Sequence, residues 1–323
     1  MTKQKIMITG AAGFIGSHLM STLLETDEYE VYGIDNFNNH LYDPKLKVDR
    51  MNHFGLYIEN IDIRDRSAVK TALIGWQPDI IIHLAAHAGV RDSFGKEQAY
   101  HSNNIDGTQN LIECIKEIVP ESRVIYASTS GVYGSTPIPE DGWNEDLLCG
   151  KQLNAYTYTK YINEIQFQIS GINNVGLRFF TVYGSWGRPD MALLDFTKNI
   201  LAGNEIEVFN YGKMKRDFTH VFDIIDGILE VIENDDIESN EIFNIGRGEQ
   251  VNLLDFVEEI EYTCGVSANI KLAPKHPADT LETFSNTSKL GKYGYEPQVS
   301  IREGVEQFYE WYRGYYVNVI GVE

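Results

Sequence analysis

The chain has 323 residues, of which 43% are hydrophobic and 23% are charged, and its formal net charge is −20 at pH 7. These proportions are ordinary for a globular enzyme, and the length is enough for one large domain or two closely packed ones. The negative charge argues against nucleic acids and anionic membranes as partners, because their phosphates would be repelled. No apolar run approaches the roughly 20 residues that a membrane span requires.

The cysteines and the N-terminus point to a cytoplasmic protein. Cys114, Cys149 and Cys264 are odd in number and widely spaced, which favours reduced thiols over a disulfide framework or a metal knuckle. Residues 1–5 lead directly into the first predicted strand, so we expect no signal peptide.

Short runs rich in Ile and Val alternate with helical patterns in the first half of the chain. Within the pattern at 156–169, residues Tyr158, Ile162, Ile165 and Ile169 keep the spacing of one apolar helix face. Alternating strands and helices predict an α/β fold with a doubly wound parallel (Rossmann) sheet. The predicted strands are 5–9, 30–34, 56–59, 79–84, 123–127 and 175–177, and the predicted helices are 15–24, 67–73, 105–117 and 156–169.

After about residue 180 this regular alternation ends, which predicts a smaller C-terminal α/β substrate domain. We expect a Rossmann domain at 1–180 and a substrate domain mainly at 181–323, with segments near 215–248 returning to the first domain. Helices are expected at 196–202, 224–233, 253–263 and 301–312, and strands at 206–209, 218–221 and 242–245.

Three glycines follow the first predicted strand and open the first helix. Gly10 permits a tight turn, Gly13 allows the backbone to approach a pyrophosphate, and Gly16 allows close packing of helix on strand. The phosphates of a dinucleotide would lie at the helix N-terminus, beside Phe14 and Ile15, where free N–H groups point outward.

An acidic residue ends the second predicted strand. Asp35 follows Gly16 by 19 residues, where a carboxylate accepts hydrogen bonds from ribose hydroxyls and repels a 2′-phosphate. No Arg or Lys stands in the next several residues, which begin with Asn36. The sequence therefore favours NAD over NADP.

A tyrosine and a lysine four residues apart share one face of the helix predicted at 156–169. The ammonium of Lys160 would favour the phenolate of Tyr156 and lower its pKa. Thr129 follows the fifth predicted strand, within the sequence ASTSGVYG. A GxxGxxG loop, a hydroxyl and a Tyr/Lys pair in this order resemble the extended short-chain dehydrogenase/reductases.

This resemblance implies roles for the three residues and for others around NAD. Tyr156 would be the base, Thr129 would hydrogen-bond the same substrate oxygen, and Lys160 would balance charge and hold the cofactor ribose. A structural role for Asn104 is as plausible as one beside the nicotinamide. The cofactor-binding residues implied are Gly10, Gly13, Phe14, Ile15, Gly16, Asp35, Asn36, Asp62, Ile63, Leu84, Ala85, Ala86, Asn104, Tyr156 and Lys160.

Two histidines four residues apart, His83 and His87, raise the question of a metal site. They flank the end of a predicted strand, where this spacing does not bring side chains together as it would on a helix. No Cys or acidic cluster completes a ligand set, so we expect no metal.

The residues before Val132 indicate which reaction the family scaffold performs. Related nucleotide-sugar dehydratases and decarboxylases usually carry acidic residues where this chain has Ser130 and Gly131. Neither residue can act as a general acid or base at neutral pH. The resemblance therefore favours simple oxidation and re-reduction, which is the chemistry of a 4-epimerase and makes the enzyme an isomerase.

Residues 177–192, with the sequence LRFFTVYGSWGRPDMA, resemble the UDP-glucuronate 4-epimerases, although that family usually has Pro at Ser185. The resemblance implies that Thr181 and Arg188 bind the sugar carboxylate, and an Arg fork matches a carboxylate. A surface salt bridge is the alternative for Arg188. Val208 and Phe209 would flank uracil, and Arg216 would bind the diphosphate. The substrate-binding residues implied are Arg91, Ser128, Thr129, Ser130, Thr181, Arg188, Val208, Phe209, Arg216 and Asp279.

The leading hypothesis is an NAD-dependent epimerase that interconverts UDP-glucuronate and UDP-galacturonate. The alternatives on the same scaffold are a UDP-glucose or UDP-N-acetylglucosamine 4-epimerase and a UDP-glucuronate decarboxylase. A redox-sensing or scaffold protein is disfavoured, because the reactive Thr, Tyr and Lys are all present. Relatives pair the helices equivalent to 105–117 and 156–169, so we expect a homodimer.

Overall fold

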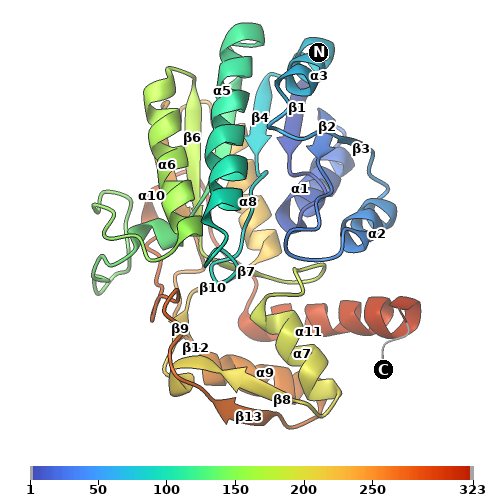
Figure 1. Ribbon diagram of the computed structural model, residues 1–323, viewed down its shortest axis with the longest axis vertical. Coiled ribbons are helices and arrows are strands. Elements are labelled where there is room, and N and C mark those ends of the chain that lie inside the picture. The colour runs from blue at the N-terminus through green and yellow to red at the C-terminus, as the bar shows by residue number, and fades with distance from the viewer. Residues whose placement is uncertain (1–2, 321–323) are drawn as a thin grey trace.

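The computed structural model describes residues 3–320, and the side chains of residues 3–317. Met1 and Thr2, at the start of the predicted first domain, and residues 321–323, at the end of the second, lie outside the described residues. The centre of the molecule is a parallel sheet of seven strands (Figure 1). In spatial order the strands are β11 (Glu241–Ile245), β6 (Asn174–Phe179), β5 (Arg123–Thr129), β4 (Ile80–His83), β1 (Gln4–Thr9), β2 (Tyr29–Asp35) and β3 (Ile58–Asn60).

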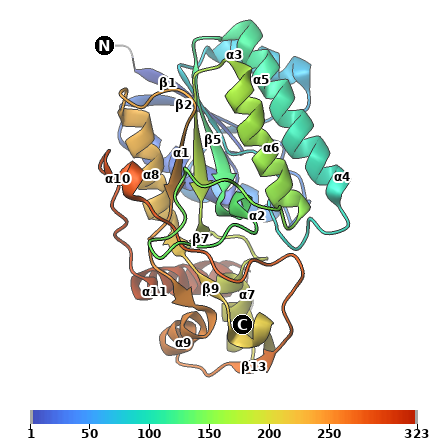
Figure 2. The same cartoon turned by 90° about the vertical axis from the view of Figure 1, so that its left-hand side faces the viewer.

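Helices cover both faces of this sheet, because its strands are apolar on both sides. In β1, Ile6 and Ile8 pack on one face and Met7 packs on the other. The first face is covered by α1 (Phe14–Glu25) and α8 (Val221–Glu233), and the second by α3 (Arg66–Trp76), α5 (Gly107–Ile118) and α6 (Ala155–Ser170). Figure 2 shows α8 on one side of the sheet and α5 and α6 on the other. The predicted doubly wound parallel sheet is confirmed.

The strand order reverses between β1 and β4. The chain runs outward from β1 to β2 and β3, and then crosses to β4 on the other side of β1. In open parallel sheets, ligands bind at the carboxyl ends of the strands at such a switch point. The loops after β1 and β4 approach closely there, since a Cβ on Gly10 would lie only 2.7 Å from the Ala85 backbone nitrogen.

A second group of elements with its own apolar core lies beyond the lower end of the sheet in Figure 1. Strand β8 (Glu205–Val208) pairs with β13 (Asn269–Leu272), and β9 (Lys215–Arg216) pairs with β12 (Val251–Asn252). Three helices enclose this core: α7 (Ala192–Leu201), α9 (Leu253–Cys264) and α11 (Ile301–Tyr312). The domain boundary at residue 180 stays a prediction.

The two later strands that the sequence predicts have different partners. The segment predicted at 242–245 lies in β11 at the edge of the large sheet. The segment predicted at 218–221 forms β10 (Phe218–His220), which pairs with β7 (Thr181–Tyr183) and not with the large sheet. Short helical turns complete the described chain: η2 (Ser130–Tyr133), η3 (Phe209–Gly212), α10 (Ser288–Gly291) and η4 (Arg313–Ile320).

Some helices were not apparent in the apolar pattern. Helix α2 (Lys45–Phe54) buries Leu46 together with two charged residues, Lys47 and Arg50, so its inner face does not look apolar in the sequence. The predicted helix at 105–117 is α5, preceded by α4 (Glu97–Tyr100) and a π-helical segment η1 (His101–Asp106). A π-helical segment shifts the helix register, so simple 3–4 spacing does not reveal it.

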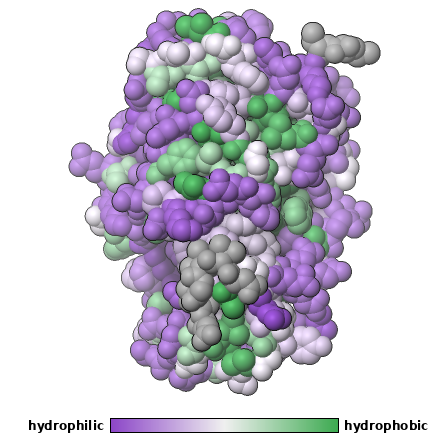
Figure 3. Space-filling model, turned by 90° about the vertical axis from the view of Figure 1, so that its right-hand side faces the viewer, coloured by the Kyte–Doolittle hydropathy of each residue, from purple (hydrophilic) through white to green (hydrophobic). Residues whose placement is uncertain are grey.

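Hydrophilic residues cover most of the face drawn in Figure 3, and hydrophobic residues appear there as separate areas. In the part of the chain that the structure describes, no helix combines the length and the apolar character needed to cross a membrane.

Candidate active site

A cavity of about 890 Å³ opens at the carboxyl end of the sheet, between the sheet and the second group of elements. Most of the site residues predicted from the sequence line it. The exceptions are Asp62, Asn104 and Val208.

The glycine loop forms a cradle that side chains would fill. Gly10 has a φ of +73°, which favours glycine, and a Cβ on Gly16 would lie 2.3 Å from the Gly10 carbonyl oxygen. A Cβ on Gly13 would lie 2.9 Å from the same oxygen. Helix α1 starts directly behind this loop, and Phe14 and Ile15 line the cavity. The close backbone approach and the helix N-terminus fit a bound pyrophosphate.

Asp35 ends β2 beside this cradle, as predicted, and it has a partner that the sequence analysis missed. Its Oδ1 accepts hydrogen bonds from the Phe37 backbone N–H (2.8 Å) and from Lys47 Nζ (3.0 Å). Lys47 also lines the cavity. The residues directly after Asp35 contain no Arg or Lys, as the sequence shows, but α2 returns Lys47 to the end of β2.

The neighbouring residues predicted to contact the cofactor form a small polar network. Asn36 Nδ2 donates to Asp62 Oδ2 (3.1 Å), and the Arg64 guanidinium donates to both oxygens of Asp62. These bonds, chiefly that from the Arg64 side chain, lower the pKa of Asp62 to about 2. Asn36 and Ile63 line the cavity, whereas Asp62 does not line it and contacts the cavity residue Asn36 through the hydrogen bond from Asn36 Nδ2.

Asn104 braces the loop after β4, where Leu84, Ala85 and Ala86 line the cavity. Its side-chain oxygen accepts from the His87 N–H (2.7 Å), and its Nδ2 donates to the His87 carbonyl (3.0 Å) and to Thr159 Oγ1 (2.9 Å). The buried Asn104 therefore links this loop to α6. These contacts support the structural alternative for Asn104.

His83 and His87 do not converge on one point. His83 is buried between the hydroxyls of Thr9 (2.8 Å) and Thr108 (3.0 Å), while His87 stacks on His40 with ring centroids 3.9 Å apart. Within residues 3–320 there is no group of three His, Cys, Asp or Glu side chains arranged to hold a metal ion.

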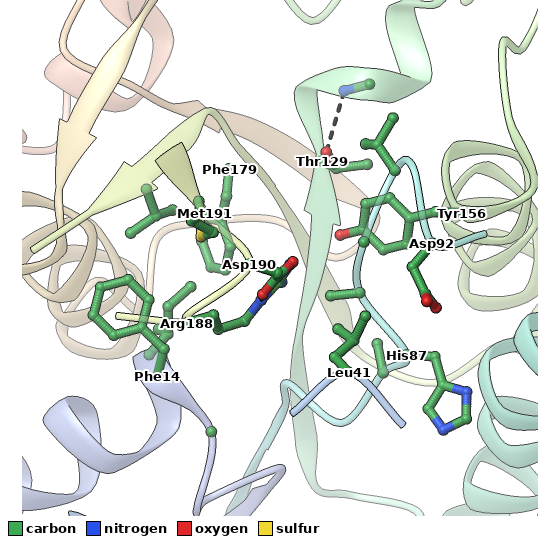
Figure 4. Close-up of a pocket in the computed structure, with 18 of the residues that line it drawn as sticks. Phe14, Leu41, His87, Asp92, Thr129, Tyr156, Phe179, Arg188, Asp190 and Met191 are labelled. Carbon is green, nitrogen blue, oxygen red and sulfur yellow. Dashed lines mark hydrogen bonds and ion pairs between the residues drawn. The ribbon is translucent and has the colours of Figure 1, made fainter. Parts of the chain in front are cut away.

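The predicted reactive groups meet at the centre of the cavity. Tyr156 and Lys160 lie on α6, and the Tyr156 hydroxyl points toward Thr129 at the end of β5 (Figure 4). Burial raises the pKa of Tyr156, while the charge of Arg188 and a hydrogen bond with Thr129 lower it. The charge of Arg188 thus acts on the phenol in addition to the predicted pairing of Tyr156 with Lys160, and the helix spacing does not reveal it. Burial lowers the pKa of Lys160 itself to about 8.

A buried ion pair behind these groups was not predicted. Arg178 on β6 donates from Nε and Nη2 to the two oxygens of Glu164 on α6, both at 2.9 Å. Ser128 Oγ donates to the same carboxylate (2.6 Å). The Ser128 hydroxyl, which the sequence assigns to substrate, is therefore engaged within the protein, and the pair joins β5, β6 and α6.

The predicted carboxylate-binding residues lie on the segment that leaves the sheet after β6, where Thr181 begins β7 and Arg188 lies in the loop that follows it. Thr181 and Arg188 both line the cavity, and Arg188 extends from the wall opposite Tyr156 (Figure 4). The loop is held by Arg50 of α2, which donates twice to the Trp186 carbonyl (3.0 and 2.7 Å). Arg188 also forms a two-point ion pair with Asp190, a cavity residue that the sequence analysis did not single out.

The residues predicted to contact the nucleotide gather at the far end of the cavity. The Arg91 guanidinium pairs with Asp279 (2.8 Å) and lies 4.0 Å from the centre of the Phe209 ring. Arg216 donates to the carbonyls of Thr280 and Leu281, and burial lowers its pKa to about 10, so it remains charged at neutral pH. Ser130 also lines the cavity.

Val208 corrects one prediction. Its side chain is fully buried in the core of the second group of elements and does not reach the cavity. It ends β8, where inward residues pack against α7 and α9, so a side-chain contact with a base is left to Phe209.

The chain is similar in sequence to a known protein family and to individual proteins. The model of the NAD dependent epimerase/dehydratase family matches residues 6–246. An uncharacterized protein of Methanocaldococcus jannaschii is 42% identical over 97% of each chain. UDP-glucuronate 4-epimerase 3 of Arabidopsis thaliana is 35% identical and covers 96% of this chain, which covers 77% of that protein.

Among solved structures, UDP-glucuronic acid 4-epimerase from Bacillus cereus, in complex with UDP-glucuronic acid and NAD, matches with a TM-score of 0.89. The sequence identity is 36%, and the match covers 96% of this chain and 99% of that one. These similarities confirm the resemblance that the sequence motifs indicate.

The pairing of Asp35 with Lys47 gives a prediction for cofactor choice. Asp35→Asn removes the charge that repels a 2′-phosphate and frees Lys47 to attract one. We expect the ratio of the NADP to the NAD dissociation constant to fall by at least about tenfold, since roughly 1.4 kcal/mol corresponds to that factor. Titration of both cofactors by calorimetry measures the ratio. Asp43→Asn, the same charge change in the loop before α2, is the control, and an equal effect in both variants would contradict the assignment.

Proposed function

The chain belongs to the NAD dependent epimerase/dehydratase family, and on that basis we propose that it is an isomerase, an NAD-dependent 4-epimerase that interconverts UDP-glucuronate and UDP-galacturonate. One observation carries the choice of sugar: Arg188 lines the same cavity as Tyr156 and faces it from the opposite wall. An Arg fork there matches the carboxylate of a uronate, whereas a neutral hexose offers it no charged partner.

The residues around the cavity divide the work of the reaction. NAD, held by the glycine loop and Asp35, supplies the hydride acceptor and donor when it is bound. Tyr156 as phenolate takes the proton of the sugar C4 hydroxyl, and Thr129 hydrogen-bonds the same oxygen. Lys160 contributes positive charge beside the ribose. When the C4 ketone is reduced on its other face, Tyr156 returns the proton to the oxygen, so no proton is consumed.

The carboxylate must be held still during this sequence. A ketone at C4 makes the sugar a β-keto acid, which loses CO₂ when the bond to the carboxylate aligns with the carbonyl π system. We propose that Thr181 and Arg188 hold the carboxylate out of that alignment while the ring turns over. Arg91, Phe209, Arg216 and Asp279 would hold the UDP end of the substrate.

A decarboxylase or dehydratase is the second candidate on this scaffold, and position 131 argues against it. Such enzymes usually carry a carboxyl group near this position, where this chain has Gly131. A Cβ at Gly131 would lie 2.3 Å from the Thr157 methyl carbon. An acidic side chain could therefore be accommodated only if the Thr157 side chain turned away.

We also propose a cytoplasmic homodimer. The three cysteines are unpaired, as is usual in a reducing compartment. On α6, Ile169 is 77% exposed and Tyr158 is 43% exposed, which suits a helix that packs against a second copy together with α5. Light scattering on micromolar protein should give about twice the chain mass of 36.7 kDa, and a monomer would contradict the proposal.

The reaction itself is tested with purified protein, NAD and UDP-glucuronate, with the products resolved by NMR. We expect UDP-galacturonate to accumulate to equilibrium without stoichiometric NADH. Tyr156→Phe should reduce turnover by about 10²–10⁴-fold and leave NAD binding nearly unchanged, because the ring remains and only the proton acceptor is lost. Sustained NADH formation by wild type, or near-normal turnover by the variant, would refute this account.

Arg188→Ala tests the carboxylate contact. Removing a charged hydrogen-bonding partner from a partly buried carboxylate should lower kcat/KM for UDP-glucuronate by at least about tenfold, since such bonds are worth roughly 1.5–3 kcal/mol. The variant should also release a UDP-pentose, because the freed carboxylate can reach the alignment that decarboxylates. Activity on UDP-glucose is the control. Unchanged uronate activity in the variant would exclude Arg188 from substrate binding.

A further inference from the structure

Arg188 already has a carboxylate partner within the protein. Its Nε donates to Asp190 Oδ1 (3.0 Å) and its Nη2 donates to Asp190 Oδ2 (2.6 Å). This two-point geometry is the one by which an Arg fork binds any carboxylate. Both side chains line the cavity, and Figure 4 shows them together, opposite Tyr156. Asp190 thus occupies one of the two-donor edges of the guanidinium to which a sugar carboxylate could bind.

Hydrogen bonds hold the backbone around this pair, whereas the Asp190 side chain is partly exposed. The Met191 N–H donates to the Arg188 carbonyl (3.2 Å), which closes a turn with Pro189 at its second position. Arg50 holds the loop upstream through the Trp186 carbonyl. The Asp190 side chain is 33% exposed, so it can rotate into water without burying an unpaired charge. An anion that reaches Arg188 therefore displaces a side chain and not the loop.

We propose that Asp190 is an internal counter-ion that occupies Arg188 in the free protein and competes with the sugar carboxylate for it, and so sets the affinity for uronates. The inference rests on the proposed function, because it concerns the sugar that Arg188 binds. Asp190 is a specificity-determining residue in this account and takes no part in the chemistry. It keeps Arg188 paired between turnovers, and its return to Arg188 favours release of the uronate product.

Asp190 affects uronate binding in two opposite ways. Its charge repels the sugar carboxylate, and its hydrogen bonds hold Arg188 in one rotamer, so the larger of the two effects decides the result. Two unit charges about 5 Å apart at an effective dielectric of about 20 repel by an energy worth on the order of a hundredfold in a binding constant. Holding a long Arg side chain in one rotamer is worth a factor of about 30 at most. Asparagine retains an oxygen that can accept one hydrogen bond from Arg188, so the Asp190→Asn variant would lose only part of the contribution from holding the Arg188 rotamer. Removal of the charge should therefore strengthen uronate binding.

The experiment compares Asp190→Asn with a matched control in the Tyr156→Phe protein loaded with NAD, where substrate binds but does not turn over. Asp195→Asn is the control, because Asp195 lines the same cavity and bonds to Asn199 but not to Arg188. Calorimetric dissociation constants are measured for UDP-glucuronate and UDP-glucose. Asp190→Asn should tighten UDP-glucuronate by at least about tenfold and change UDP-glucose by less than about twofold. With Tyr156 restored, KM for UDP-glucuronate should fall in the same proportion.

Unchanged or weaker uronate binding in Asp190→Asn would overturn the counter-ion role, and weaker binding would mean that Asp190 mainly orients Arg188. Equal tightening of both sugars, or the same gain in Asp195→Asn, would also overturn it, because the effect would then be one of general charge. Failure of the proposed function is a separate result. If wild type does not epimerise UDP-glucuronate, both conclusions fall, whereas an active wild type with an unresponsive Asp190→Asn refutes only this inference.

Discussion

The bidentate ion pair between Glu164 and Arg178 holds together the elements that carry the reactive groups. Glu164 lies one helical turn after Lys160 on α6, and Ser128, which also bonds Glu164, precedes Thr129 on β5. Arg178 lies on β6, three residues before Thr181. A buried pair adds little net stability, because desolvation offsets attraction, but loss of one partner leaves a costly unpaired charge. The pair therefore works chiefly as a constraint on position.

Pairing of charged side chains is also found within the cavity of this acidic chain. Most of its cations are matched to a nearby oxygen partner: Lys47 to Asp35, Arg91 to Asp279, and Arg188 to Asp190. Arg216 is instead surrounded by backbone carbonyls. These partners fix each cation against one part of a nucleotide sugar or dinucleotide. A protein with a net charge of −20 can thus present positive charge to an anionic ligand without a broad basic surface.

Much of the fold and of the candidate site could be predicted from the sequence, because the motifs that indicate them are local. The glycine spacing, the acidic end of β2 and the Tyr/Lys spacing depend on short stretches whose geometry is set by one turn or one helix. Lys47 and Arg50 could not be placed because they lie on α2, a helix without an apolar pattern. Glu164 could not be placed because its partner, Arg178, lies on a different element, β6. Asp190 stands only two residues from Arg188, but the turn that brings them together depends on the loop held by Arg50. Val208, whose side chain is buried in the core instead of lining the cavity, shows that a position in a motif does not determine which way its side chain points.

The central claim is that C4 of one sugar loses its hydrogen and regains it on the opposite face. It is tested most directly with UDP-glucuronate that carries deuterium at C4. The account predicts UDP-galacturonate with the deuterium still at C4, because the abstracted atom returns to the same carbon without exchange with water. NMR and mass spectrometry of the product decide the matter. Loss of the label to solvent, or a product that keeps it while lacking the carboxylate, would contradict the account.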